Sequence, residues 1–173
     1  MTRPLIIVSS KTGNTKILAR GIADLAGNIE LVDSKALPEE LSAFNPVGLF
    51  FWCDRGMAPE DIRCAARRLS GKQFACFATM GGDPSAEKAL AWMEKTSASL
   101  VEEGSNNILK GTFLSQGRIG PALFDRMTTM AGGVTPEREA RRKAAETHPD
   151  RLDIENALAA WHTFFEAPAD SNS

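Results

Sequence analysis

The segment from Ser9 to Thr15, Ser-Ser-Lys-Thr-Gly-Asn-Thr, carries groups that could hold an anion. It joins a short apolar run to the start of a helical pattern, and the free N–H groups at a helix start attract negative charge. The hydroxyls of Ser10, Thr12 and Thr15 can donate to phosphate oxygens, while Gly13 lets the backbone bend close to a ligand. A capped helix start rich in small polar residues would look the same. An anion site and an ordinary helix cap therefore both remain open.

Three other ligand-binding patterns do not fit this segment. A P-loop requires Gly-x-x-x-x-Gly-Lys-Ser/Thr, whereas Gly13 is followed by Asn14-Thr15-Lys16. A dinucleotide fingerprint requires Gly-x-Gly-x-x-Gly, and only one glycine is present. A receiver domain requires acidic residues after its first strand, and Ile7-Val8-Ser9 offers none. Any phosphate here would be held mainly by hydroxyls and amides, with little fixed positive charge.

Five short apolar runs have the length and composition of buried strands. They are Leu5–Val8, Ile29–Val32, Val47–Trp52, Phe74–Ala78 and Ile108–Leu114. Helical patterns separate most of them, and this alternation predicts a parallel sheet with helices on both faces. The fifth run includes Lys110 and Thr112, so we expect it at an edge of the sheet.

Several helix ends can be predicted from capping residues. Gly27 is expected to end the first helix and Pro59 to open the second. Asp83-Pro84 predicts a cap and a first residue for the third helix. The last helix is expected from about Leu152 to Phe165, with Thr147-x-x-Asp150 as a capping box in which Asp replaces Glu.

The segment 116–149 before the last helix is irregular, and connections of this length are usually functional or partly disordered. Its prolines allow two helical pieces, near Pro121–Met130 and Pro136–Thr147. Phe124, Met127 and Met130 have helical spacing and could pack onto the domain, form a lid or form a docking surface. The charged stretch Glu137–Lys143 is expected to be a solvated helix face or a docking patch.

Composition limits the class of protein. The 173 residues suit one domain, and 20 basic against 22 acidic residues give a net charge of −2, which predicts no nucleic-acid partner. The apolar runs are far shorter than the roughly 20 residues that span a bilayer, so no membrane partner is expected. Arg3 followed by only four apolar residues is not a signal peptide. Three cysteines without metal-site spacing indicate no disulfide framework, and a cytoplasmic location is expected.

The pattern Ser10-x-Thr12-Gly13-Asn14-Thr15, between a buried strand and a helix, resembles the phosphate loop of the flavodoxin family, Ser/Thr-x-Thr-Gly-x-Thr. The resemblance covers roughly Pro4–Leu114 and Leu152–Phe165. It implies a flavodoxin-like three-layer α/β/α sandwich with a five-stranded parallel sheet in the order 2-1-3-4-5. Residues 1–173 would form one such domain, with the excursion 116–149 before its last helix.

The resemblance also implies an FMN cofactor at the carboxyl ends of the central strands, where ligands bind in this topology. The first loop would hold the phosphate with Ser9, Ser10, Lys11, Thr12, Gly13, Asn14 and Thr15. The second and third loops would hold the flavin ring between them. They would contribute Trp52, Cys53, Asp54, Arg55, Gly56 and Met57, and then Thr79, Met80, Gly81, Gly82 and Asp83. No catalytic residue and no metal ligand is implied.

The two ring loops have expected roles and ordinary alternatives. In flavodoxins a glycine of the second loop lets a peptide flip, so that a carbonyl meets the N5–H of the partly reduced flavin. Gly56 is the candidate here, and a simple turn before Pro59 is the alternative. Trp52 would lie against the ring or be a core aromatic at the strand end. The N–H groups of the third loop would bond the O2, N1 or N3 edge of the ring, or the loop is a plain strand-to-helix turn.

The chain departs from the family in the residues near the ring. Flavodoxins commonly stack a tyrosine on the flavin, and this chain has none, which leaves Trp52, Met57 and Met80 as substitutes. Arg55 near the ring would favour the anionic reduced flavin and raise its redox potential. Lys11 would pair with the phosphate or point to water. The net charge also differs from the strongly negative docking face of many flavodoxins.

Three functions remain open at this point. The first is an FMN-binding electron-transfer protein that shuttles electrons between two redox partners, a reductase and an acceptor enzyme, while the chain binds and tunes the flavin. The second is an NAD(P)H-dependent FMN reductase or quinone-reductase-like enzyme, for which 116–149 would supply a pocket wall. The third is a binding module that has kept the fold and lost the flavin. The phosphate loop favours the first, and the missing tyrosine gives weight to the third.

Overall fold

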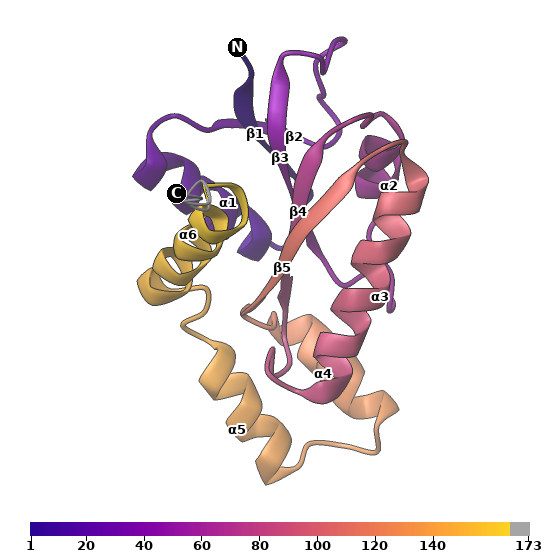
Figure 1. Ribbon diagram of the computed structural model, residues 1–173. Coiled ribbons are helices and arrows are strands. Elements are labelled where there is room, and N and C mark those ends of the chain that lie inside the picture. The colour runs from indigo at the N-terminus through magenta and orange to yellow at the C-terminus, as the bar shows by residue number, and fades with distance from the viewer. Residues whose placement is uncertain (167–173) are drawn as a thin grey trace.

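The computed structural model describes residues 1–166, in which one parallel sheet is covered by helices on both faces (Figure 1). Its strands are β1 (Arg3–Val8), β2 (Glu30–Asp33), β3 (Phe44–Trp52), β4 (Gln73–Met80) and β5 (Ile108–Gln116). The order across the sheet is β2-β1-β3-β4-β5, with every pair parallel. The predicted strands, their order and the edge position of β5 are confirmed. Residues 167–173 of the predicted domain lie outside the described residues.

Successive residues of the central strands point to opposite faces of the sheet and enter two separate hydrophobic cores. Leu5 and Ile7 of β1 lie in the core under α2 (Glu60–Arg67) and α3 (Glu87–Glu103). Ile6 and Val8 lie in the core under α1 (Asn14–Ala26) and α6 (Arg151–Phe165). Because both faces of the sheet are covered, the strands are nearly continuous apolar runs.

The start of α3 differs from the prediction. The helix begins at Glu87 with Ala86 as its N-cap, three residues after the predicted cap Asp83. The Asp83 carboxylate instead accepts hydrogen bonds from the N–H of Ser85, at 2.9 Å, and from its hydroxyl, at 2.7 Å. Asp83 therefore closes a separate turn between β4 and the helix, a common alternative use of an Asp side chain.

The cap of α6 also differs from the prediction. Asp150 is the N-cap, and Asp150 and Asp153 exchange hydrogen bonds between side chain and backbone at 2.8 and 2.9 Å. The capping box is therefore formed by these two residues rather than by Thr147 and Asp150. The predicted end of α1 at Gly27 is confirmed, with a left-handed φ of 74°.

The excursion contains two helices, α4 (Pro121–Met130) and α5 (Pro136–Ala145), where helical pieces were predicted. In Figure 1 they extend the molecule beyond the end of the sheet at which the strands finish. The N–H of Gly117 donates to the carbonyl of Met80 at 2.8 Å, and the side-chain amide of Asn14 donates to the carbonyl of Arg118 at 2.8 Å. The excursion is thus fixed at its start to β4 and to α1. Within residues 1–166, none of the helices combines the length and apolar character needed to cross a membrane.

Candidate functional site

The phosphate loop connects the end of β1 to the first turn of α1. Gly13 is the N-cap, with a left-handed φ of 99°, and α1 begins at the next residue. The Ser10 hydroxyl oxygen accepts hydrogen bonds from the N–H groups of Gly13, at 3.1 Å, and Lys16, at 3.3 Å. One side chain of the loop therefore caps two of the backbone donors at the helix start.

Other donors of this loop are free. Among residues 1–166, the N–H groups of Lys11, Thr12, Asn14 and Thr15 have no hydrogen-bond acceptor. Thr12 is exposed, so its hydroxyl can reach a ligand. The Thr15 hydroxyl is buried and lies 2.8 Å from the hydroxyl of Thr79 at the end of β4. The loop thus offers several backbone donors and the Thr12 hydroxyl to an anion at the positive end of α1.

A carboxylate holds the loop in place from the other side. Asp61, in the first turn of α2, accepts hydrogen bonds from the hydroxyls of Ser9 at 2.7 Å and Ser34 at 2.6 Å. Ser9 follows β1 and Ser34 follows β2, so this one side chain joins the ends of two neighbouring strands to α2. Charge-assisted hydrogen bonds of this kind are stronger than neutral ones.

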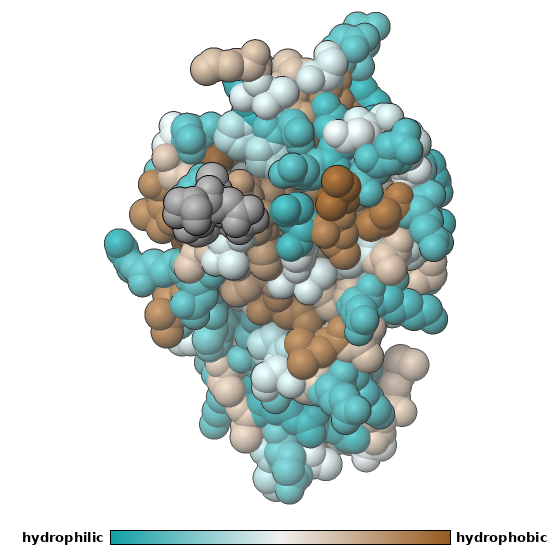
Figure 2. All heavy atoms as spheres, viewed as in Figure 1, coloured by the Kyte–Doolittle hydropathy of each residue, from teal (hydrophilic) through white to brown (hydrophobic). Residues whose placement is uncertain are grey.

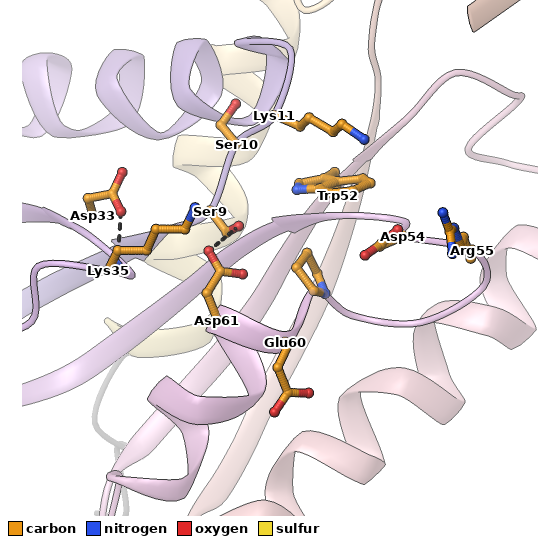
Figure 3. A pocket seen from close by; sticks show the side chains of 11 residues that line it. Ser9, Ser10, Lys11, Asp33, Lys35, Trp52, Asp54, Arg55, Glu60 and Asp61 are labelled. Carbon is orange, nitrogen blue, oxygen red and sulfur yellow. Dashed lines mark hydrogen bonds between the residues drawn. The ribbon is translucent and has the colours of Figure 1, made fainter.

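A cleft of about 630 Å³ opens between the first loop, the end of β2 and the second loop (Figure 3). It is lined by Ser9, Ser10, Lys11, Asp33, Lys35, Trp52, Asp54, Arg55, Pro59, Glu60 and Asp61. The half-buried Trp52 presents its ring to the cleft, and the Lys11 ammonium lies over that ring, 5.4 Å from its centroid. The pair combines an aromatic face with a cation beside the phosphate loop.

The second loop contains a tight turn. Asp54 and Met57 exchange two backbone hydrogen bonds, at 2.8 and 2.9 Å, around Arg55 and Gly56. Both central residues have left-handed φ values, 52° and 78°, which is the pattern of a type I′ turn. Gly56 adopts this conformation without strain because it has no Cβ, whereas Arg55 adopts it at an energetic cost. Burial raises the pKa of the neighbouring Cys53 thiol above its ordinary value.

The third loop, Thr79–Asp83, does not line the cleft. Its Gly81 is covered by Ile119 of the excursion, so closely that a Cβ at residue 81 would lie 2.6 Å from the Ile119 side chain. The hydrogen bonds from Ser85 lower the pKa of Asp83. The end of β4 is therefore packed against the excursion in this structure.

The structure brings together six of the predicted site residues around the cleft: Ser9, Ser10, Lys11, Trp52, Asp54 and Arg55. The other predicted residues lie in the same three loops but outside its lining. Sequence reasoning missed Asp33, Lys35, Pro59, Glu60 and Asp61. A signal for the first two existed, since the expected order places the end of β2 beside the phosphate loop.

A polar cluster lies away from the cleft, at the start of α6. His148, Asp150 and Asp153 have potential metal-ligating atoms within 4.8 Å of one another. The Asp153 carboxylate already lies 2.6 Å from Nδ1 of His148 and accepts from the N–H of Asp150 at 2.8 Å. Hydrogen bonding to the Asp153 backbone lowers the pKa of Asp150. These groups are used as the cap of α6.

The fold and the first loop agree with what a comparison with known protein families finds. The points of agreement are the sheet order, the free N–H groups of the loop and its place at the carboxyl ends of the strands. Residues 5–162 match the family model described as flavodoxin domain. The chain belongs to the flavodoxin domain family. A curated member of similar length, the flavodoxin-like domain-containing protein BilS of Clostridioides difficile (strain CD3), is 27% identical over 165 residues, which cover 90% of this chain and 92% of that protein.

Solved structures agree with this flavodoxin fold. The Trp repressor binding protein from Bacillus subtilis matches with a TM-score of 0.51 at 14% identity, covering 86% of this chain and 97% of that one. A putative flavoprotein from Bacteroides uniformis ATCC 8492 matches with a TM-score of 0.50 at 18% identity, covering 82% and 96%. At these identities the likeness concerns the fold.

Flavodoxins use a flavin, and the residues of the first loop fit the phosphate of FMN. The fit rests on the free N–H groups of Lys11, Thr12, Asn14 and Thr15 at the positive end of α1. For the flavin ring, Trp52 offers an aromatic face at the cleft, in a chain that has no tyrosine.

Proposed function

We propose that this flavodoxin-family protein binds FMN and carries electrons between a reductase and an acceptor enzyme. The observation that supports it most directly is the first loop, with its free backbone donors between a buried strand and α1. Anion binding by such a loop needs no fixed charge on the protein, which suits a phosphate ester.

In this proposal the chain binds and orients the cofactor, and FMN supplies the electron chemistry when bound. The N–H groups of the first loop and the Thr12 hydroxyl hold the phosphate. Trp52 would offer an aromatic face to the ring system, and the Lys11 ammonium would add a positive charge beside the phosphate. Arg55 places a cation near the ring, where it favours the reduced, anionic flavin.

One observation favours a second candidate, a flavin enzyme reduced directly by NAD(P)H. The cleft continues past the phosphate loop to the end of β2, where Asp33 and Lys35 line it. In this candidate the NAD(P)H nucleotide would approach the flavin from the β2 side of the cleft.

An anaerobic titration decides between the two functions. The purified chain is titrated with FMN, followed by absorbance, and then reduced stepwise with dithionite or with NADPH. The electron carrier binds FMN, is reduced by dithionite and stays oxidised in NADPH without a partner. Rapid bleaching by NADPH alone supports the enzyme, and a chain that takes up no FMN contradicts both.

A further inference from the structure

Exposed apolar side chains gather on and directly after α4. The exposed fractions are 41% for Leu123, 53% for Met127, 90% for Met130 and 61% for Val134. Leu123, Met127 and Met130 follow one another at helical spacing and form one line along the helix, here called the α4 stripe. Phe124 and Thr128 are buried and anchor the helix through a neighbouring line. Because Phe124 and Thr128 face the protein, the α4 stripe faces solvent. Its methionines have flexible side chains that can adapt to the surface of a partner.

Positive charge accompanies the α4 stripe. Arg126 lies on the same helix beside it, and Arg118, Arg141 and Lys143 belong to the same excursion. None of these four pairs with an acidic group within residues 1–166. Residues 118–147 contain six basic and four acidic residues, an excess of two positive charges, although the whole chain has a net charge of −2. Figure 2 shows hydrophilic groups at the lower end of the molecule, where Figure 1 places α4 and α5.

This surface is attached to the loops of the proposed FMN site. Ile119 covers Gly81 of the third loop, and the carbonyl of Arg118 accepts from the side chain of Asn14 in the first turn of α1. α4 begins two residues after Ile119. A protein that binds to the α4 stripe would therefore lie at the end of the sheet where the flavin would be bound.

We propose that the α4 stripe, with Arg126 beside it in a segment that carries two excess positive charges, forms the docking surface for an acidic redox protein that presents an apolar patch surrounded by carboxylates. The inference rests on the proposed electron-transfer function. A basic partner would meet the unpaired Arg126 and the positive excess of residues 118–147 with like charge, and so would a second copy of this surface, which costs binding energy. A partner with carboxylates around an apolar patch would pair its carboxylates with the basic side chains and its apolar patch with the α4 stripe.

The test uses the full chain loaded with FMN and the acidic haem protein cytochrome b5 as the probe. The reduced protein is mixed anaerobically with ferric cytochrome b5, and each electron that leaves the flavin converts one ferric haem to the ferrous form. We expect the second-order rate constant to fall as salt is raised. Arg126→Glu and Met127→Gln should each lower it by roughly threefold to tenfold at low salt, since they remove charge steering and apolar contact.

Matched variants on α1 serve as controls. Arg20→Glu makes the same charge change, and Leu25→Gln removes an apolar side chain with 48% exposure, close to that of Met127. These controls should keep the original rate, and all four variants should keep the original FMN affinity. Equal rates for the α4 variants and the unaltered chain overturn the proposal. Weaker FMN binding by Met127→Gln also overturns it, because the stripe would then belong to the cofactor site.

The docking surface can also be tested if the proposed electron-transfer function fails. If the chain takes up no FMN, the proposed function fails, and docking is tested on the flavin-free chain by titrating it with cytochrome b5 and following backbone amide resonances. Salt-sensitive shifts concentrated in residues 121–134 support the docking surface. Shifts elsewhere, or none, overturn it.

Discussion

The hydroxyl oxygens of Thr15 and Thr79 lie 2.8 Å apart in the buried interior and join the first turn of α1 to the end of β4. Replacing one partner leaves the other hydroxyl buried without a hydrogen bond, which costs about 1–3 kcal/mol. Thr79→Val should therefore lower the free energy of unfolding by that amount in urea denaturation. The double variant Thr15→Val/Thr79→Val should recover much of the loss, because no polar group is then stranded. Additive losses would show that the two hydroxyls do not depend on each other.

Thr12 offers the clearest test of the phosphate loop, because its side chain is exposed and its hydroxyl bonds to no other described residue. Thr12→Val should weaken FMN binding by about 1.5–3 kcal/mol, the usual contribution of a hydrogen bond to a charged group. Thr112→Val, at an exposed position on β5, is the matched control. Riboflavin, which lacks the phosphate, should bind both variants and the unaltered chain equally. The assignment fails if FMN binds the Thr12 variant as tightly as the control.

Gly56 should be intolerant of side chains for conformational reasons alone. A Cβ there would meet no atom within 4 Å, but the residue has a φ of +78°. Gly56→Val should cost on the order of 1–3 kcal/mol of stability or shift the turn, and change the midpoint potential of bound FMN. Gly120→Val is the control, because that glycine is equally open and has a φ of −63°. Equal effects of the two substitutions would exclude a special role for the turn.

Glu103 should make stability depend on pH in the acidic range. Arg67 and Arg63 donate to its carboxylate at 2.7 and 2.9 Å, and these bonds lower its pKa below the ordinary 4.5. The stabilisation is therefore present above pH 4.5 and is lost as the pH falls through the lowered folded-state pKa. Glu103→Gln should be less stable at pH 7 and show a shallower loss between pH 5 and 3. Glu102→Gln is the matched control, because this exposed neighbour forms no ion pair among the described residues.

The sequence predicts the sheet well because the central strands β1, β3 and β4 are buried on both faces and so stand out as apolar runs. Helix ends were harder, because one Asp can cap a helix or close a turn. Asp83 does the second, and the choice depends on where α3 packs. The role of Asp61 could not be predicted from the sequence for a similar reason. An acidic residue in the first turn of a helix is common, and only the assembled sheet brings the hydroxyls of Ser9 and Ser34 to this carboxylate.

Arg55 should tune the potential of bound FMN. It lines the cleft at the tip of the second loop, is exposed, and forms no ion pair within the described residues. Arg55→Gln removes a cation that favours the negatively charged reduced flavin, so the midpoint potential should become more negative. An exposed charge acting through solvent contributes on the order of 0.5 kcal/mol, and salt should weaken the effect. The measurement is a spectroscopic redox titration at low and high salt, with Arg20→Gln on α1 as the distant control. A potential that Arg55→Gln leaves unchanged at low salt would place the flavin ring away from the second loop.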